Sequence, residues 1–326
     1  MGHLGIRRLR AGDPDAHAAV DAVRAACVAA GEDDPLDEAT DLAWRHGGLE
    51  AADVHLASLT ADTSGGPGGF ALVSGDEVVV AVAPAVRGAG LGTARAALAA
   101  PEAGPGAGAW SHGHHPAAAR LAARVGWRPV RSLWVMRRAL DGGPDGGPDA
   151  LPPLPARDDV VLARLADHDD APDLLEQDVA EVLAVNARAF AHHPEQGDLD
   201  RAGFDERRAE PWFDPADLLL VRRRAATGRG ELLAFHWTKR HDEDHGEVYV
   251  VGVDPSAQGL GLGRFATLAG LHHLRARGVR RVHLYVEADN AAALHTYTRL
   301  GFAHADADTH TRFAPRATHT GAEAGR

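Results

Sequence analysis

The residues with the clearest chemical potential are the seven from Gln258 to Arg264, which read QGLGLGR. Glycines occupy positions 259, 261 and 263, so this backbone carries few side chains and can adopt positive φ angles. Backbone N–H groups that converge at the N-terminus of a helix bind phosphate groups. The segment therefore predicts a loop that holds a diphosphate, to which Gln258 and Arg264 add hydrogen bonds and charge.

A degraded copy of this loop lies earlier in the chain, from Arg87 to Thr93. When the glycines are superposed, Asp76 aligns with Glu247 and Arg87 aligns with Gln258. A second pair of segments, residues 115–127 and residues 290–302, matches in length and pattern. Two matches in the same order and at nearly the same spacing indicate a tandem duplication.

The sequence on both sides of the second loop predicts the strands and helices that position it. Residues 247–254 (EVYVVGVD) form a nearly continuous apolar run, which is typical of a buried strand. Residues 264–278 and 291–300 are predicted helices that end at glycines, and residues 279–287 are a predicted strand between them. Alternating strands and helices predict an α/β unit in each copy.

Composition limits the class of protein. The chain has 326 residues, 45% hydrophobic and 25% charged, as expected for a globular chain of about two domains. Its formal net charge of -12 argues against a nucleic-acid partner. Cys27 is the single cysteine, which excludes an intramolecular disulfide and a cysteine-based zinc site. The histidines at 112, 114 and 115 lack an accompanying carboxylate-helix ligand pattern, so no metal is expected.

No signal-peptide pattern and no run of about 18 apolar residues occurs, so we expect a cytoplasmic protein without a membrane partner. We also expect it to be a monomer. The Pro/Gly-rich residues 141–157 predict a linker between an N-terminal domain, residues 1–140, and a C-terminal domain, residues 158–313. The polar residues 314–326 are predicted to be a disordered tail.

The glycine motif can be interpreted as one of three kinds of phosphate-binding loop. A fourth interpretation is a glycine-rich turn with only a structural role. The Walker loop is excluded because no Lys-Ser/Thr pair follows. The dinucleotide pattern GxGxxA matches Gly261 to Ala266, but Asp254 to Gln258 separate that pattern from its strand. The third is the Q/R-x-x-G-x-G/A loop of the GNAT acetyltransferases, which both copies resemble. The V-x-P strand end before the loop and the N-A-A-x-x-x-Y helix after it are also typical of that family.

The resemblance implies an α/β fold of two tandem GNAT domains, each a mixed twisted sheet flanked by helices. It implies acetyl-CoA as co-substrate, held by a strand that splays from its neighbour and by the glycine loop. The implied cofactor residues of the second copy are Val251, Gly252, Val253, Gln258, Gly259, Leu260, Gly261, Leu262, Gly263, Arg264, Asn290, Ala291, Ala292, Ala293, Leu294 and His295. Those of the first copy are Val80, Ala81, Val82, Gly88, Ala89, Gly90, Leu91, Gly92 and Thr93.

The longer strings AFAHHPEQGDLD, EPWFDPADLLL, FHWTK and LYVEADNAAALHTYTRLGF resemble the mycothiol synthases, a family of tandem GNAT proteins with an active C-terminal half. That resemblance implies acetylation of the cysteinyl amine of a cysteinyl-glucosaminyl-inositol pseudodisaccharide, which gives mycothiol and CoA. It implicates five residues in holding this small-molecule substrate, namely Glu38 (with Asp37 as the alternative counterpart), Glu195, Lys239, Glu247 and Tyr285.

The resemblance also implies that the tyrosine at 297 protonates the departing CoA thiolate, with Tyr285 as the alternative acid. Ala122 stands at the equivalent place in the first copy, so the chemistry is expected in the second. A carboxylate such as Glu247 is suited to accept the proton of an amine nucleophile. The alternatives are a tandem GNAT enzyme for another small amine, an aminoglycoside or a peptide N-terminus, and a non-catalytic acetyl-CoA sensor.

Overall fold

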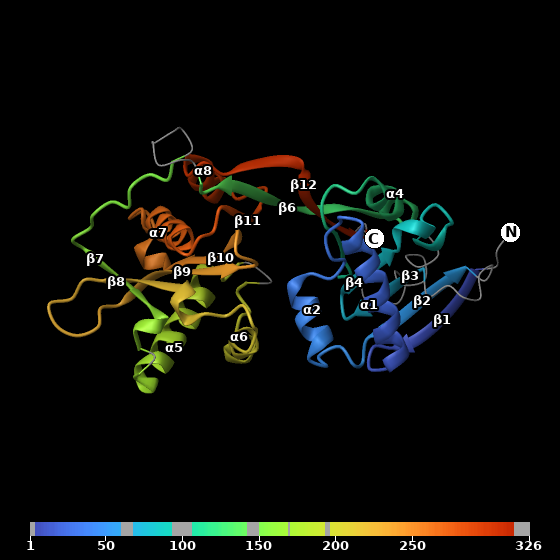
Figure 1. Cartoon of the computed structure of the whole chain (residues 1–326), viewed down its shortest axis with the longest axis horizontal. Helices are drawn as coiled ribbons and strands as arrows, with labels where there is room; N and C mark the ends of the chain where they lie inside the picture. The colour runs from blue at the N-terminus through green and yellow to red at the C-terminus, as the bar shows by residue number, and fades with distance from the viewer. Residues whose placement is uncertain are drawn as a thin grey trace, which may run out of the picture. The chain divides into compact units, whose positions relative to one another are not determined.

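The computed structural model describes residues 4–59, 68–92, 106–141, 150–168, 170–192 and 196–315. The chain forms two compact units (Figure 1). The first contains Met1–Leu133 and Asp306–Arg326, and the second contains Trp134–Ala305. The units therefore divide within strands and not within the linker, whereas the domain limits predicted from the sequence remain a prediction.

The second unit is built on the strands that precede and follow the glycine loop. Its sheet contains, as neighbours, β11 (Arg281–Glu287), β10 (His245–Val253), β9 (Leu232–Arg240), β8 (Leu218–Arg223) and β7 (Val160–Arg164). The pairs from β7 to β10 are antiparallel, and β10 pairs with β11 in parallel. The sheet is therefore mixed, as expected.

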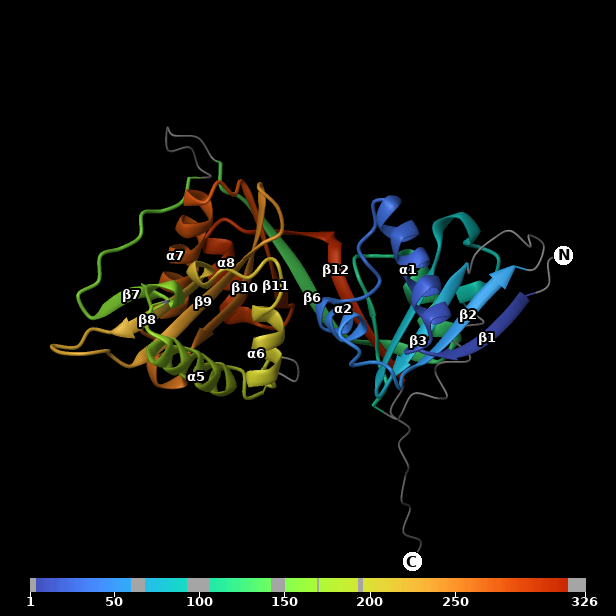
Figure 2. The same ribbon diagram turned by 60° about the horizontal axis from the view of Figure 1, so that its bottom comes forward.

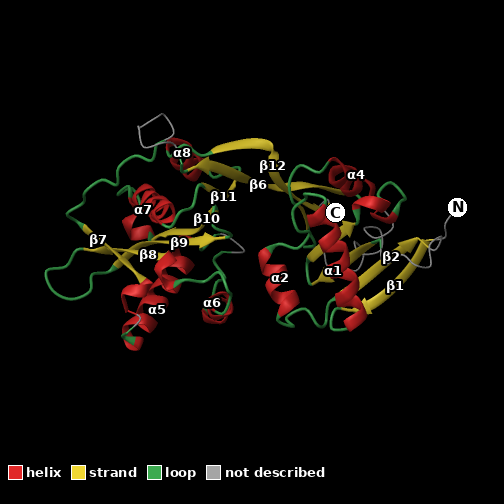
Figure 3. Cartoon of the chain, viewed as in Figure 1, coloured by secondary structure: helices red, strands yellow, loops and turns green. Residues whose placement is uncertain are grey.

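Helices cover both faces of this sheet (Figures 2 and 3). Helix α7 (Leu262–Ala276) packs on one face through Leu262, Phe265 and Leu268. On the opposite face lie α5 (Pro172–Ala189) and α6 (Arg201–Arg208), which contribute Val182 and Phe204 to a core with Trp237 of β9. Helix α8 (Ala291–Arg299) follows β11.

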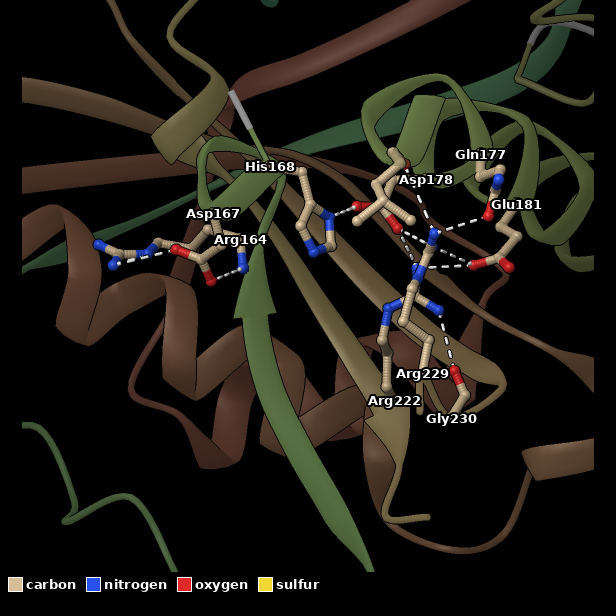
Figure 4. A network of polar contacts seen from close by, with 10 residues as sticks. Arg164, Asp167, His168, Gln177, Asp178, Glu181, Arg222, Arg229 and Gly230 are labelled. Atoms are coloured by element: carbon tan, nitrogen blue, oxygen red, sulfur yellow. Dashed lines mark hydrogen bonds and ion pairs between the residues drawn. The ribbon is translucent and has the colours of Figure 1, made fainter. Parts of the chain in front are cut away.

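A buried ion network fastens α5 to β8 (Figure 4). The carboxylate of Asp178 on α5 is fully buried and accepts hydrogen bonds from Arg222 of β8 and from Arg229. His168 Nδ1 lies 2.5 Å from the other carboxylate oxygen of Asp178. Glu181, one turn further along α5, lies 2.6 Å from Arg222 and 3.2 Å from Arg229. The two arginines are thus neutralised by carboxylates from a single helix.

The first unit contains a four-stranded antiparallel sheet of β1 (Leu4–Arg10), β2 (Asp53–Leu59), β3 (Gly69–Ser74) and β4 (Glu77–Val82). Helix α1 (Pro14–Ala29) packs on it through Val20 and Val23, and α2 (Glu38–Arg45) contributes Trp44 to the same core. The thiol of Cys27 is buried in this core, as expected for a small apolar residue. Strand β5 (Ala109–Ser111) and helix α4 (Pro116–Arg124) complete the unit.

Two long strands each continue from one unit into the other. Strand β6 (Trp127–Ala139) runs from the first unit into the second, where Met136 packs in the core with Leu268 and Leu284. Strand β12 (Ala303–Pro315) runs in the opposite direction, and its residues Thr311 to Phe313 pair with β5. The second unit therefore contains part of a strand from the first copy of the repeat, and the first unit contains part of a strand from the second copy.

The duplication predicted from the sequence recurs in the backbone. The 3₁₀ turns Pro84–Val86 and Pro255–Ala257 occupy equivalent positions before the two loops. Helices α4 and α8 have nine residues each and begin one residue after His115 and Asn290, which both cap them through a side chain. Strands β6 and β12 have 13 residues each.

Part of the predicted linker is ordered against the second unit. Leu151 is buried with the core residues of α7, and His272 Nε2 lies 2.8 Å from the carbonyl oxygen of Pro152. Residues 142–149, and residues 316–326 of the predicted tail, lie outside the described residues. In the part of the chain that is described, no helix combines the length and the apolar character that crossing a membrane requires.

Candidate active site

The strand before the glycine loop leaves its neighbour halfway along. Strand β10 pairs with β9 as far as Val253, but its parallel register with β11 covers only residues 245–247. Beyond Glu247 the β11 side of β10 has no registered partner strand among the described residues. This is the splay that the family resemblance implies, and it leaves the backbone N–H and C=O groups of residues 251–253 without a registered strand on the β11 side. Gly252 is required here, because a Cβ would lie 2.3 Å from the Phe235 ring.

The glycine loop has the conformation of an anion-binding helix N-terminus. After the 3₁₀ turn, Gln258 is extended, and Gly259 and Gly261 have φ angles of 80° and 73°. Helix α7 begins at Leu262, so the N–H groups of its first turn have no intrahelical acceptor. These donors and the helix dipole point toward the same end of α7, which suits a diphosphate.

Arg157, at the end of the predicted linker, braces this loop and was not anticipated from the sequence. Its guanidinium donates a hydrogen bond of 2.8 Å to the carbonyl oxygen of Leu260 and is itself held by Asp159. It also lies 5.9 Å from the Phe265 ring centroid. Arg157 thereby fixes the peptide group between Leu260 and Gly261. Because Arg157 lies outside the glycine motif, the sequence gave no signal of this contact.

Replacing Arg157 by alanine is expected to raise KM for acetyl-CoA by about 2- to 10-fold and to leave kcat nearly unchanged, because one hydrogen bond that orders the loop is lost. Steady-state kinetics with varied acetyl-CoA would measure this. Arg223→Ala is the matched control, because that arginine is more exposed and pairs with Glu231 on the strand edge. Equal KM values for the two variants would contradict the role assigned to Arg157.

Three polar residues lie side by side where the strands separate. Glu247 of β10 is opposite Lys239 of β9 and opposite His283 of β11. Directly opposed residues project from the same face of a sheet. Phe235 and Trp237, which share this side of β9 with Lys239, pack in the core under α5 and α6. The predicted residues Lys239 and Glu247 are therefore brought together, on the sheet face opposite α7.

Glu247 is a buried carboxylate surrounded by imidazoles. It is 6% exposed, its Oε2 lies 2.8 Å from His241 Nε2, and it lies 3.8 Å from His283 Nε2. Burial opposes ionisation, but the hydrogen bond from His241 and the positive charges nearby hold the pKa of Glu247 below its usual range. The carboxylate is therefore ionised at neutral pH and can accept a proton.

Lys239 is held against aromatic rings. Its Nζ lies 4.5 Å from the centroid of Trp212 and 5.3 Å from that of Tyr249. Arg207 of α6 donates a 2.7 Å hydrogen bond to the Tyr249 hydroxyl. Sequence reasoning missed Trp212 and Tyr249 as lining residues, although Trp212 lies in the string EPWFDPADLLL that carries the family resemblance.

The two candidate acids lie on opposite faces of β11. Tyr285 shares the face of His283, two residues away, and its ring lies 5.3 Å from that imidazole. Tyr297 of α8 instead packs with the core of α7 and lies 5.9 Å from the Phe302 ring. Burial raises the pKa of Tyr297 to about 12, so its phenol keeps its proton throughout the neutral range. Tyr297 is thus on the side of the glycine loop and α7, and Tyr285 is on the side of Glu247.

The N-terminal loop has the same backbone but a different environment. Gly88 and Gly90 have φ angles of 84° and 85°, close to those of the second loop. The Arg87 guanidinium forms an ion pair with Glu32 and donates a 3.0 Å hydrogen bond to the carbonyl oxygen of Val82. Since Val82 ends the strand predicted to contact CoA, this arginine uses an acceptor that a pantetheine amide would need.

For four predicted residues, the described contacts give no role in a site. Glu195 and Thr93 lie outside the described residues. Glu38 is the first residue of α2 in the first unit, and the neighbouring Asp37 caps that helix by accepting a hydrogen bond from the Thr40 N–H. Asn290 likewise caps α8, through the Ala293 N–H. The roles of these residues remain predictions.

Comparison with known proteins agrees with this geometry. The family model "Acetyltransferase (GNAT) family" matches residues 182–302. A GCN5-related N-acetyltransferase structure from Sphaerobacter thermophilus has a TM-score of 0.65 at 22% identity and covers 95% of this chain and 94% of its own. A tandem GNAT protein from the clavulanic acid biosynthesis pathway has a TM-score of 0.61 at 17% identity, with 95% and 98% covered. The fold and the site thus define an acetyl-CoA-dependent acetyltransferase of the tandem GNAT class, which confirms the predicted fold class.

The nearer sequence relatives define the family within that class. A mycothiol acetyltransferase of a Nocardioides species is 49% identical over 92% of this chain and 97% of its own length. Another, from Nocardia farcinica, is 45% identical over 94% of this chain and 97% of its own. The chain belongs to the mycothiol acetyltransferase family, which confirms the family predicted from its longer motifs.

Proposed function

We propose that the protein transfers the acetyl group of acetyl-CoA to the cysteinyl amine of cysteinyl-glucosaminyl-inositol and releases mycothiol and CoA. The observation that carries this proposal is the buried, ionised Glu247 at the point where β10 leaves β11, opposite Lys239. The high identity to relatives named mycothiol acetyltransferase supports the choice of product.

The chemistry requires one proton acceptor and one proton donor. The α-amine has a pKa of about 8 and must lose a proton before it attacks. Glu247 takes that proton, directly or through water, and the new C–N bond forms as the thioester C–S bond breaks. A backbone N–H of residues 251–253 polarises the thioester carbonyl. Tyr297, on the side of α7, donates its proton to the departing thiolate.

Replacing Tyr297 by phenylalanine is expected to lower kcat by about 10- to 100-fold, because the hydrogen bond to a developing thiolate is lost. The affinity for acetyl-CoA and the midpoint of thermal unfolding should change little, since the ring still packs against Phe302. Single-turnover kinetics and a thermal melt would measure the two effects. If Tyr285→Phe slows turnover and Tyr297→Phe does not, the acid is the other tyrosine.

The substrate is proposed to lie on the Glu247 side of the sheet. Lys239 and Tyr285 lie on that side and are proposed to bind hydroxyl groups of the sugar and inositol rings, with Glu195 and Glu38 as further predicted contacts. Lys239 argues against a polycationic aminoglycoside, because an ammonium group held on this face would repel it. A second amine substrate or a peptide N-terminus remains the alternative.

The test uses the purified full chain, acetyl-CoA and the cysteinyl pseudodisaccharide, with release of the CoA thiol as the measurement. Turnover of this amine at a kcat/KM at least about 100-fold above that of an aminoglycoside or a peptide would support the proposal. Turnover of another amine alone would replace the substrate and keep the enzyme class. Acetyl-CoA binding without turnover of any amine would favour a sensor.

The N-terminal loop remains a proposed second CoA site, weakened by the pairing of Arg87 with Glu32. Equilibrium dialysis would count one CoA per chain if that loop is empty and two if it is occupied. Action as a monomer in the cytoplasm is part of the same proposal, and sedimentation would report the oligomeric state.

A further inference from the structure

A cluster of imidazoles surrounds the carboxylate at the active site. His241, His245 and His283 have ring centroids 4.7 to 5.2 Å apart, and Glu247 lies among them. The mechanism above uses none of these histidines. We propose that His241, Glu247 and His283 form a binding site for one divalent transition-metal ion, such as zinc, and that the bound ion inhibits the enzyme by blocking Glu247.

The donor atoms have the separations that zinc requires. One ligand atom from each of His241, Glu247 and His283 lies within 4.8 Å of the other two. Zinc bound at about 2.0 to 2.2 Å with tetrahedral geometry sets its ligand atoms about 3.3 Å apart. The observed separations of 2.8 and 3.8 Å from Glu247 Oε2 lie on either side of this value. The third separation, between the two imidazole nitrogens, is at most 4.8 Å, so the His241 ring, which lies at an exposed turn, must move inward to complete three sides of a tetrahedron.

The imidazole of His283 is also held in a fixed orientation, as a metal ligand must be. His283 is 5% exposed, and its Nδ1 lies 2.8 Å from His245 Nε2, a contact to the second ring nitrogen that orients a metal-binding imidazole. Two imidazoles with one carboxylate match a common zinc ligand set that leaves a fourth position open.

Three cationic side chains near the cluster would repel a metal ion, but none of them belongs to the three proposed ligands. Lys239 acts on Glu247, Arg137 acts on His283 and His245, and Arg281 acts on His245. The Lys239 ammonium is turned onto the rings of Trp212 and Tyr249. None of these cations lies between the three donor atoms, because those atoms are already close to one another.

A metal ion at this site would inhibit acetyl transfer because Glu247 is the proposed proton acceptor. A Glu247 oxygen that is bound to zinc cannot accept the proton of the amine, and an amine bound at the fourth position has no free electron pair for attack. A cysteinyl group offers both an amine and a thiol to that position, so the substrate itself would compete for the ion or bind to it. This second half of the inference rests on the proposed function, whereas the metal site does not.

The site is tested by binding, independently of activity. The metal-free full chain is titrated with zinc in competition with a chromophoric chelator, and X-ray absorption reports the ligands. We expect one equivalent bound in the micromolar range or tighter, with two imidazoles in the spectrum. His283→Leu should weaken binding at least about 10-fold, and His46→Gln, an exposed histidine of the first unit, should bind as the wild type does.

If His283→Leu does not fold, His241→Gln serves in its place, since that ring lies at an exposed turn. Equal zinc affinity in the wild type and in the folded variant, or no binding near 10 μM, overturns the site. In the kinetic arm, zinc should lower kcat for the amine without weakening acetyl-CoA binding, because the ion occupies the proton acceptor. Zinc binding without a loss of turnover overturns the inhibitory role, and a failure to acetylate this amine leaves the binding result intact.

Discussion

Glutamine at position 247 is expected to lower kcat by about 1000-fold, within the range of 10²–10⁴ that a positioned base contributes. The amide has nearly the same shape as the carboxylate but cannot accept the proton of the attacking amine. The affinity for acetyl-CoA should stay within about 2-fold of the wild type, because the glycine loop and the backbone of residues 251–253 are unchanged. Single-turnover kinetics and calorimetric titration with acetyl-CoA measure the two quantities.

Glu243→Gln is the control, since that exposed carboxylate lies in the turn between β9 and β10. The pH profile adds a separate check. Because the pKa of Glu247 is held below its usual range, its carboxylate is already ionised at pH values well below neutral. The fall of kcat/KM on the acidic side of the profile must therefore reflect protonation of the substrate amine, whose pKa is about 8. Glu247→Gln should lower the whole profile without moving this limb. A variant as active as the wild type would show that Glu247 is not the base.

Asparagine at position 178 is expected to lower the free energy of unfolding of the second unit by about 3 to 5 kcal/mol. The substitution removes the only fully buried carboxylate of the network and leaves Glu181 as the carboxylate beside Arg222, whose side chain is 6% exposed and keeps a hydrogen bond to the Gly230 carbonyl oxygen. Removing one partner of a buried ion pair costs more free energy than the intact pair contributes, because the remaining charge stays buried without compensation. Urea unfolding, with the transitions of the two units fitted separately, measures this loss.

Asp173→Asn is the matched control, because that aspartate lies exposed in the first turn of the same helix. It should cost under about 1 kcal/mol, the usual contribution of a charge near a helix end. Equal losses for the two variants would show that the network in Figure 4 contributes no special stability.

Local signals were enough to predict the loop and its flanking elements. Glycines at 259, 261 and 263 were expected to allow positive φ angles, which Gly259 and Gly261 adopt and Gly263, inside α7, does not. The helix predicted over residues 291–300 begins at Ala291. These features depend on residues close in sequence, where backbone preferences decide the outcome. Family motifs supplied Glu247 and Lys239, which the strand register then placed opposite each other.

The imidazoles around Glu247 could not be predicted in the same way. His283 becomes a neighbour of Glu247 only through the parallel register of β10 and β11, which depends on packing between distant segments. His241 reaches the carboxylate because the turn after β9 folds back on β10, and its place in the charged string KRHDEDHGE suggested only a solvated loop. Arg157 acts through a contact over 103 positions in sequence, which no local pattern encodes.

The strands that continue from one unit into the other also bear on how this protein can evolve. A gene cut within residues 142–149 would separate the second unit from Trp134–Ala139 and the first unit from the end of β12. The N-terminal fragment would keep strands β1 to β4 but lose the β12 strand that pairs with β5, and the C-terminal fragment would lose β6. The first copy carries Ala122 where the second carries Tyr297, yet deleting the first copy would remove β6 and expose a sheet edge in the second unit. The shared strands therefore give selection a structural reason to retain both copies.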